Sequence, residues 1–573
     1  MFQQDPRAVA DSLALSALCA LIPLAVLFIL LGGLKVRAWI AGLCSLAAAI
    51  VVAVVLFGMP VGQSISAAAN GALFGFFPIL WIVINAVWIY NLTVASGHFD
   101  VLRRSFEKVS PDQRIQAIII AFCFGALLEA LAGFGTPVAI SVVMLMSLGF
   151  RPVKAAVVAL VANTAPVAFG ALAIPIVTLA PIVSGVSSDP RLSDANALHT
   201  LGSMVGRQTP ILALVVPLIL VFIVDGRRGL RQTWIPALLA GFVFAVAQFV
   251  TSNYISVQLT DIVASLLAAG SLVLLVRVWQ PAQTLTAELA ASESEEHATP
   301  SASSGRRSAG ATATGGASGR ARPSADDRTE VLRAYAPYLV IIIIFSISNI
   351  PAVVDFLAEE PFTYLFDWPG LDIVNAAGDP VVTQFKFNWL PAAGTMLILA
   401  GLISMVILKL SPAKAFKTYL ETYAELRSAI ITVMAVLALA YVMNLSGQTV
   451  SLGSWLAETG AAFAIISPIL GWIGVAVTGS DTSSNSLFGA LQAQAAVKAG
   501  LDPVLMAASN SSGGVLGKMV SPQNLAIAAA AVGMSGQEGD IFRKVIFWSV
   551  LLLALMCLIV GLQSTAVLSW MVP

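Results

Sequence analysis

Long runs of apolar residues alternate with short polar interruptions along almost the whole chain. Stretches such as SLALSALCALIPLAVLFILLGGL (12–34) contain no charged residue. They exceed the roughly 20 residues that a helix needs to cross the hydrocarbon core of a bilayer. The pattern predicts twelve such spans, over residues 12–34, 38–58, 71–97, 155–185, 209–224, 234–255, 259–278, 333–350, 389–409, 428–447, 503–533 and 546–567.

Two further apolar segments carry polar residues at their centres. The first, residues 115–149, contains AGFGTP and is flanked by Arg114 and Arg151. Basic residues favour the cytoplasmic side of a membrane, so both ends of this segment are expected there. Its second arm is about 12 residues, or roughly 18 Å as a helix, which is too short to cross. We therefore predict a re-entrant hairpin over 115–149, and a second over 454–499, where GSDTSSN interrupts the apolar run.

The polar pattern repeats at a spacing of 347 residues, which places GFGTP opposite SDTSS. The span before the first hairpin runs inward and the one before the second runs outward, so the two halves are predicted to be inverted. Many secondary transporters have this architecture, with the binding site near the membrane midplane. The matched residues are Asn163 with Asn510, Gly170 with Gly517, and Pro175 with Pro522.

The repeat also predicts how the chain is divided. Residues 281–330 include a Ser/Ala/Gly-rich run of mixed charge that cannot bury a core, so they are expected to form a flexible cytoplasmic linker. The predicted parts are a first inverted repeat (1–232, with hairpin 115–149 and broken helix 155–185), connecting helices (233–280), the linker (281–330) and a second inverted repeat (331–573, with hairpin 454–499 and broken helix 503–533).

Composition agrees with an all-α polytopic membrane protein. Of the 573 residues, 58% are hydrophobic and 10% are charged, far from the balance of a soluble domain. No cleavable signal peptide is evident, and both termini are expected outside the cytoplasm. The net charge is zero and gives no indication of a nucleic-acid partner. The four cysteines lie singly in apolar segments, which argues against a disulfide framework or a thiolate metal site.

The broken segments are the candidate site for a small anion. Thr136-Pro137, Ser483 to Asn485, Asn163 to Pro166 and Asn510 to Gly514 each resemble a helix start, where unpaired N–H groups attract negative charge. The alternative is that these glycines and prolines only form packing kinks. The candidate substrate-binding residues are Gly133, Gly135, Thr136, Asn163, Thr164, Ser480, Thr482, Ser483, Ser484, Asn485, Asn510, Ser511, Ser512 and Lys518.

Three ionisable residues fall in or beside these segments. An ionisable group inside a membrane is costly and is a functional candidate by default. Glu129 is the leading candidate for the proton carrier, and Asp481 is its rival. Lys518 is expected to bind a substrate carboxylate or to neutralise Asp481. The alternatives are a Glu129 that stays protonated and bonds across helices, and a Lys518 with a purely structural pairing.

Four motifs resemble the bacterial L-lactate permease family, which includes glycolate permeases. The motifs are GALLEALAGFGTPVAI, NTAPVAFGALAIPI, GSDTSSNSLFGALQ and SNSSGGVLGKMVSPQN, and the resemblance extends in order over nearly the whole chain. It implies proton-coupled symport of L-lactate, and often D-lactate and glycolate, across the bacterial inner membrane. A homodimer is compatible with the sequence.

Two other transport classes stay open from the residues themselves. A sodium-coupled carrier of dicarboxylate or gluconate would share the inverted-hairpin plan, and an anion channel is a weaker alternative because no continuous charged pore is readable. An enzyme is not expected. His98, His199 and His297 lie in loops or the linker, and no nucleophile with a base, metal cluster or cofactor motif is present.

Overall fold

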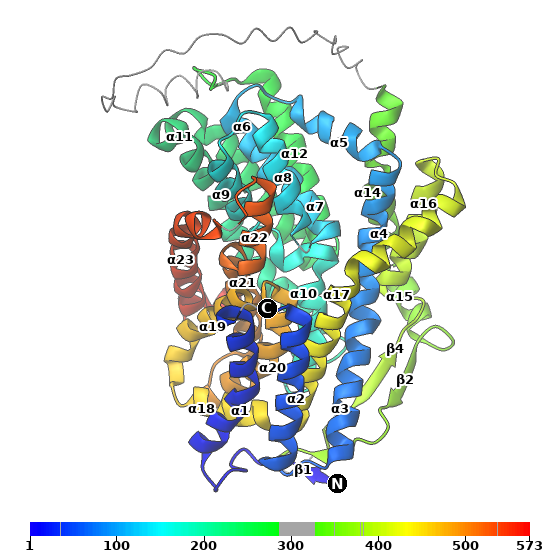
Figure 1. Ribbon diagram of the computed structural model, residues 1–573, viewed down its shortest axis with the longest axis vertical. Helices are drawn as coiled ribbons and strands as arrows, with labels where there is room; N and C mark the ends of the chain where they lie inside the picture. The colour runs from blue at the N-terminus through cyan, green and yellow to red at the C-terminus, as the bar shows by residue number, and fades with distance from the viewer. Residues whose placement is uncertain are drawn as a thin grey trace, which may run out of the picture.

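The computed structural model is built almost entirely of helices, as the apolar pattern predicted (Figure 1). Eleven helices among the described residues are long and apolar enough to cross a membrane, which makes the chain a multi-pass membrane protein. The interior of the predicted linker, 286–326, and Phe134 of the GFGTP motif lie outside the described residues. The structure describes residues 1–34, 36–133, 135–285, 327–348, 350–376, 378, 380–381, 383–535 and 537–573.

The described part of the first half contains twelve α-helices. They are α1 (Leu13–Phe28), α2 (Ala38–Val55), α3 (Val61–Phe74), α4 (Trp81–Ala95), α5 (His98–Glu107), α6 (Gln113–Gln116), α7 (Gly125–Ala132), α8 (Thr136–Ser147), α9 (Pro152–Ala162), α10 (Gly170–Ser184), α11 (Ala197–Tyr254) and α12 (Thr260–Val278). Shorter helical segments of other pitch continue some of them, namely η1 (Ile29–Gly33), η2 (Gly75–Leu80), η3 (Ala117–Phe124) and η4 (Val167–Phe169).

The second half contains ten α-helices in its described part and a small amount of strand. The helices are α14 (Arg328–Ser348), α15 (Pro351–Ala358), α16 (Ala393–Ile407), α17 (Pro412–Leu445), α18 (Gln448–Ala457), α19 (Phe463–Thr478), α20 (Asp481–Ala499), α21 (Pro503–Gly517), α22 (Pro522–Ala531) and α23 (Glu538–Gln563). Strand β1 (Phe2–Gln3) pairs in parallel with β3 (Ile373–Val374), and β2 (Tyr364–Asp367) pairs antiparallel with β4 (Gln384–Phe387).

Some predicted spans differ in length from the observed helices. The spans 209–224 and 234–255 both fall on α11, which ends at Tyr254, and Asp225, Gly226 and Thr233 have non-helical backbone angles that mark the bend between them. The span 389–409 corresponds to α16, which has 15 residues. The apolar pattern therefore located the helices. Their bends and ends depend on turn residues, which hydrophobicity alone does not identify.

Each segment predicted as a re-entrant hairpin contains a packed helix pair, called a hairpin below, and its re-entry into the membrane stays a prediction. The α7–α8 pair and the α19–α20 pair each turn back on themselves within a few residues. Figure 1 shows the first pair in the upper half of the molecule and the second in the lower half, with α10 and α21 between them. The turns of the two hairpins therefore approach each other from opposite ends of the molecule.

The first broken helix is interrupted where the sequence predicted, but the second is not. Helix α9 ends at Ala162, and turns and η4 lead to α10, which begins at Gly170. The predicted unwinding at Asn510 to Gly514 is wrong, because α21 continues through these residues and ends at Gly517. The chain restarts instead at Ser521, whose side chain caps α22, with Pro522 as the first helical residue.

The glycines of α21 serve close packing rather than unwinding. A Cβ atom at Gly513 would collide with the carbonyl oxygen of Pro468, and one at Gly517 would collide with that of Trp472. Both partners belong to α19, so the two helix backbones approach closely along a Gly-x-x-x-Gly face. The packing-kink alternative is thus partly right for this segment, since its small residues allow helix contact without breaking the helix.

A buried arginine anchors the first residues of the predicted linker. The Arg114 guanidinium bonds Asp112 (2.7 Å), Asp225 (3.0 Å) and the carbonyl oxygen of Gln283 (2.5 Å). The backbone of Leu285 bonds the Asp112 carboxylate and the Gln113 amide, each at 3.0 Å. The first residues of the predicted linker therefore belong to the folded core.

Deleting residues 288–325 and leaving a short Gly/Ser connection is expected to preserve uptake, because this stretch lies between two complete halves. A deletion that also removes 281–287 is expected to lower the yield of folded protein, because it takes away the Arg114 and Asp112 contacts. Both variants are compared with the intact chain by uptake in vesicles and by the amount of monodisperse protein in detergent. Lost uptake in a normally abundant 288–325 deletion would contradict the prediction.

Candidate functional site

A buried ion pair joins the two halves at their centre. Lys518 follows α21, Glu129 lies on α7, and Nζ of Lys518 is 2.5 Å from Oε1 of Glu129. The two residues are 8% and 2% exposed, and Oε2 of Glu129 has no hydrogen-bond partner among the described residues. The expected pairing of Lys518 with Asp481 is therefore replaced, in this conformation, by a contact with the carboxylate of the other half. Removing one partner of such a pair leaves an uncompensated buried charge.

Glycines make room for both hairpin carboxylates. A Cβ atom at Gly170 would lie 2.9 Å from Oε1 of Glu129, so the side chain rests against the start of α10. A Cβ atom at Gly514, on α21, would collide with Oδ1 of Asp481. In each half the carboxylate of the hairpin therefore packs against a glycine of the interrupted helix in the same half. Gly133 also lies close to Oε1 of Glu129.

Asp481 opens the return arm of the second hairpin. It is 3% exposed, and the hydroxyl of Ser511 donates a hydrogen bond to its Oδ2 (2.6 Å). Its Oδ1 has no hydrogen-bond partner among the described residues. Asp481 thus has one neutral donor and, unlike Glu129, no cation in direct contact within the part of the chain that the structure describes.

The helix caps lie slightly upstream of the predicted ones. Ser480, rather than Ser483 to Asn485, caps α20, and its side chain accepts from the amide of Ser483 (3.2 Å). Gly135, rather than Thr136, is the N-cap of α8, because its φ of +87° lies in the left-handed region that favours glycine. Thr136 is the first residue of the helix, and its side chain is half-buried.

Two of the predicted asparagines bond each other across the hairpin and the broken helix. Asn510 donates to Oδ1 of Asn485 (2.8 Å), and Gln492 donates to Oδ1 of Asn510 (2.6 Å). Asn485 in turn donates to the carbonyl oxygen of Pro175 in the other half (3.0 Å). Of these three bonds, the one from Asn485 to Pro175 joins the two halves, and the other two link α20 and α21 within the second half. Gln492 was missed, although a polar residue in an apolar arm was the available signal.

The remaining predicted residues have varied surroundings. Oδ1 of Asn163 and Oγ of Ser512 are buried without a hydrogen-bond partner among the described residues, which makes them candidates for ligand contact. Thr164 donates to the carbonyl oxygen of Val161 within its own turn (2.7 Å). Ser484 donates to the carbonyl oxygen of Gly471 (3.3 Å), and Thr482 is half-buried.

Both hairpin turns pack against the start of α22. A Cβ atom at Gly135 would lie 3.4 Å from Oδ1 of Asn524, and one at Gly479 would lie 2.6 Å from Oε1 of Gln523. Asn524 also donates to the carbonyl oxygen of Lys518 (3.0 Å). The first turn of α22 therefore links the two hairpin tips and the ion pair, a role that the sequence interpretation did not assign to Asn524.

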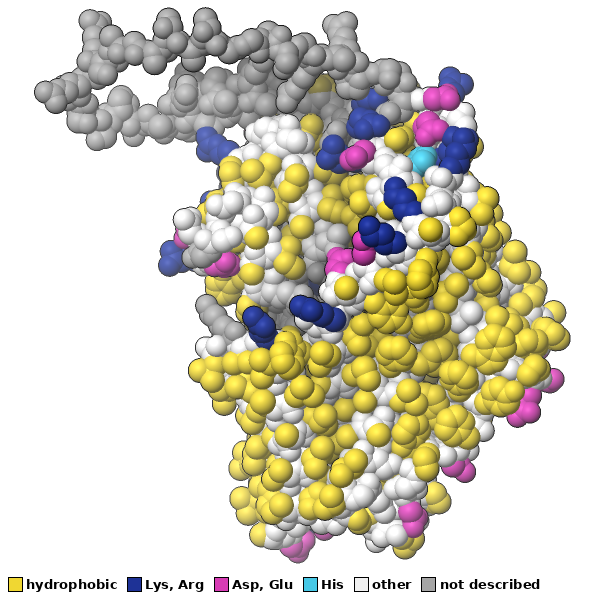
Figure 2. Space-filling view, turned by 45° about the vertical axis from the view of Figure 1, so that its right-hand side comes forward, with side chains coloured by type: hydrophobic (Ala, Val, Ile, Leu, Met, Phe, Trp, Pro, Cys, Tyr) yellow, Lys and Arg dark blue, Asp and Glu magenta, His cyan; other side chains and the backbone are white. Residues whose placement is uncertain are grey.

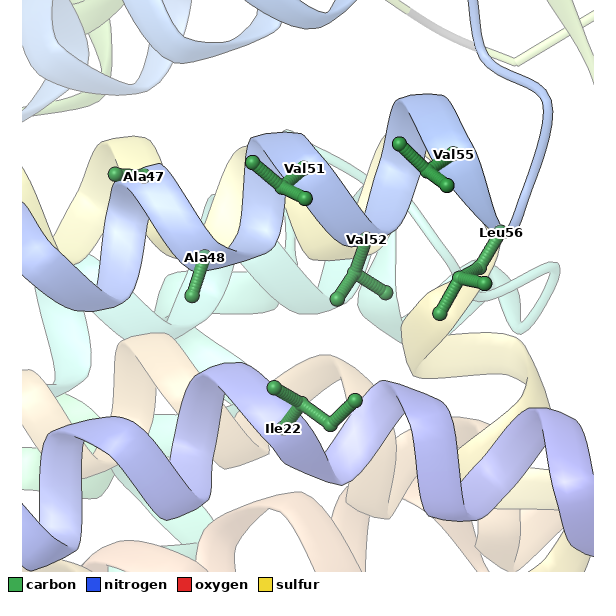
Figure 3. Close-up of a pocket in the computed structure, with 7 residues that line it drawn as sticks. All are labelled: Ile22, Ala47, Ala48, Val51, Val52, Val55 and Leu56. Atoms are coloured by element: carbon green, nitrogen blue, oxygen red, sulfur yellow. The ribbon is translucent and has the colours of Figure 1, made fainter.

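An open depression elsewhere on the molecule does not fit a carboxylate ligand. Figure 3 shows it between α1 and α2. Its lining is apolar throughout, and it offers no donor or charge to an anion. The lining residues are Ile22, Ala47, Ala48, Val51, Val52, Val55 and Leu56. The Glu129–Lys518 junction is therefore the better candidate site.

Comparison with known proteins gives consistent matches over nearly the whole chain. The family model described as L-lactate permease matches residues 16–567. An L-lactate permease of Bacillus subtilis is 39% identical over 583 residues, covering 99% of this chain and 98% of the relative. A glycolate permease of Escherichia coli is 41% identical over 563 residues, covering 96% of each.

A solved structure resembles this chain remotely. The YdaH transporter of Alcanivorax borkumensis aligns with a TM-score of 0.42 at 13% sequence identity, over 86% of each chain. A likeness of this degree carries no argument about mechanism.

Proposed function

Because the chain belongs to the L-lactate permease family, we propose that it is a proton-coupled symporter of L-lactate and related 2-hydroxymonocarboxylates, including D-lactate and glycolate. The family makes it a membrane transporter rather than an enzyme. The observation that carries the proposed coupling is the buried contact between Lys518 and Glu129.

The proposed coupling arises because the carboxylates of Glu129 and of lactate compete for the same cation, Lys518. When the carboxylate of lactate takes Lys518, Glu129 loses its counter-ion inside a buried site. An unpaired buried charge costs several kcal/mol, so Glu129 then binds a proton. Lactate binding and proton binding therefore favour each other, and this coupling is reciprocal by thermodynamic necessity.

The other buried polar groups are proposed to orient the substrate. Asn163, at the break after α9, and Ser512, inside α21, have oxygens without a partner among the described residues, and Ser511 holds Asp481 in place. The 2-hydroxyl of lactate supplies a donor and an acceptor, which suits such groups. Asp481 is the second candidate for proton coupling, because its Oδ1 has no partner among the described residues.

Alternating access is proposed to arise from the inverted hairpins. Each hairpin turn packs against α22, and each hairpin carboxylate packs against a glycine of its own half. A motion that opens one hairpin toward its side of the membrane would break the Glu129–Lys518 contact or the Asn485–Pro175 contact that joins the halves. Substrate binding at Lys518 would break the Glu129–Lys518 contact, because the substrate carboxylate takes the place of Glu129.

Uptake into proteoliposomes under an imposed gradient tests the proposed function. An inward proton gradient is expected to drive accumulation of labelled lactate, and excess unlabelled glycolate is expected to compete. Accumulation driven by sodium instead, with dicarboxylate or gluconate as the competitor, would support the sodium-coupled alternative. Passive lactate flux that depends on neither the proton gradient nor the sodium gradient, and that does not saturate, would support an anion channel.

The proposed orientation places both termini on the periplasmic side. On the face drawn in Figure 2, Lys and Arg side chains gather over the upper part of the molecule, and the lower end shows Asp and Glu. This charge asymmetry agrees with an upper end in the cytoplasm.

Cysteine labelling is expected to separate the two ends. In a chain without the four native cysteines, Lys108→Cys should react with an impermeant thiol reagent only from the cytoplasm. Thr459→Cys should react only from outside. Both residues are exposed, beside the first and second hairpins respectively. Reaction of both from the same side would overturn the inverted orientation.

A further inference from the structure

A third buried carboxylate lies beside the site and has no assigned role. Asp261 is the second residue of α12 and is 1% exposed. Its Oδ1 accepts a hydrogen bond from Nε2 of Gln248 (3.1 Å), and its Oδ2 has no partner among the described residues. A carboxylate with a single neutral donor is poorly compensated in a buried position.

Asp261 is connected to the first broken helix through Gln248. The same Nε2 of Gln248 donates to the carbonyl oxygen of Ala165 (3.3 Å), in the interruption between α9 and α10. The hydroxyl of Thr209 donates to Oε1 of Gln248 (3.2 Å), which directs the NH₂ group of the amide toward Asp261. The amide therefore bridges Asp261 to the segment on which Glu129 rests.

Among the described residues, the elements that pack most against α12 place no counter-ion in contact with Asp261. They are α11, α7, η3 and α10. Helix α7 contributes Glu129, which interacts with Asp261 as a like charge, and η3 contributes the thiol of Cys123. The nearby part of α11 contributes the neutral Gln248 and Thr209, and α10 has no titratable residue.

Lys518 cannot compensate the charges of Glu129, Asp261 and Asp481 at the same time. Lys518 is the cation in contact with Glu129, and the structure shows no second cation touching Asp261 or Asp481 among the described residues. Helix α12 packs against α7, so an ionised Asp261 would be a second buried negative charge near Glu129, and the described residues place no cation against it. Asp261 is therefore best accommodated as a neutral acid while Glu129 is ionised.

We propose that Asp261 is a second proton-binding site, which holds a proton while Glu129 is paired with Lys518 and passes it to Glu129 when substrate takes Lys518. The O–H bond at Asp261 breaks, an O–H bond forms at Glu129, and the Asp261 carboxylate is reprotonated from the aqueous side to which the site is open. This inference rests on the proposed proton-coupled symport.

The variant Asp261→Asn tests the assignment, because asparagine keeps the acceptor for Gln248 and cannot carry a proton. In proteoliposomes, proton-driven lactate uptake is expected to fall by about tenfold or more, and its pH profile to flatten. Lactate counterflow between compartments of equal pH is expected to stay within about twofold of the unchanged protein, since exchange needs no net proton transfer. Accumulation with the unchanged pH profile would overturn the proposal, and so would an equal loss of counterflow.

A second variant separates proton handling from folding. Gln248→Met removes the hydrogen bond to Asp261 and keeps a side chain of similar length. Loss of this donor disfavours the ionised carboxylate, so the pH profile of uptake is expected to move to higher pH. An unmoved profile in folded protein would contradict the assignment. If lactate uptake by the unchanged protein does not depend on the proton gradient, the proposed proton coupling itself is wrong, whatever the variants show.

Discussion

Replacing Glu129 with glutamine is expected to abolish accumulation of lactate against its gradient. Glutamine keeps the shape of the side chain beside Gly170, but it cannot exchange a proton. It also leaves Lys518 without its counter-ion, so the lysine is free for lactate at any pH. We therefore expect lactate binding to become independent of pH, whereas in the unchanged protein it should tighten as the pH falls.

Three measurements check this prediction. Uphill uptake under a proton gradient should disappear, counterflow of lactate between compartments of equal pH should remain measurable, and calorimetric titration should show no proton uptake on binding. Asp481→Asn is the matched control, because it neutralises the carboxylate of the other hairpin. If Glu129→Gln still concentrates lactate with normal pH dependence while Asp481→Asn does not, the proton carrier is Asp481.

Replacing Lys518 with alanine is expected to weaken lactate binding by about tenfold or more. A hydrogen bond to a charged group contributes about 1.5–3 kcal/mol, which corresponds to roughly tenfold to more than a hundredfold in affinity. Arg207→Ala is the control, since Arg207 bonds Asn253 (2.9 Å) and the carbonyl oxygen of Met571 (2.9 Å), away from the ion pair. Its lactate affinity is expected to stay unchanged.

Loss of Lys518 also leaves Glu129 unpaired, so folding has to be measured beside binding. Breaking a buried pair costs about 3–5 kcal/mol, unless the carboxylate takes a proton. The double variant Glu129→Gln with Lys518→Gln removes both charges, and it is expected to recover thermal stability without recovering affinity. Unchanged lactate binding by folded Lys518→Ala would assign the lysine a structural role only.

The sequence alone was sufficient for the class of the protein and for much of its architecture. Apolar runs of spanning length are local properties, so they predicted the all-α membrane fold and placed most of the helices that the structure contains. The interruption after Ala162 was also predictable, because Asn163, Thr164 and Pro166 are residue types that disfavour continued helix. The family followed from motifs that extend over nearly the whole chain.

Tertiary structure decided which side chains meet. The run from Asn510 to Gly514 was predicted as a break, but α21 is continuous there, and Gly513 and Gly517 allow the backbone of α19 to pack closely against it. Lys518 and Glu129 are 389 positions apart in the sequence, and no local pattern specifies that contact. Asp261 was overlooked because its span carries no polar interruption, and only the packing of α12 against α7 brings together the helices that carry Asp261 and Glu129. A charge inside a membrane depends for its stability on its neighbours in space, and those neighbours are set by the fold.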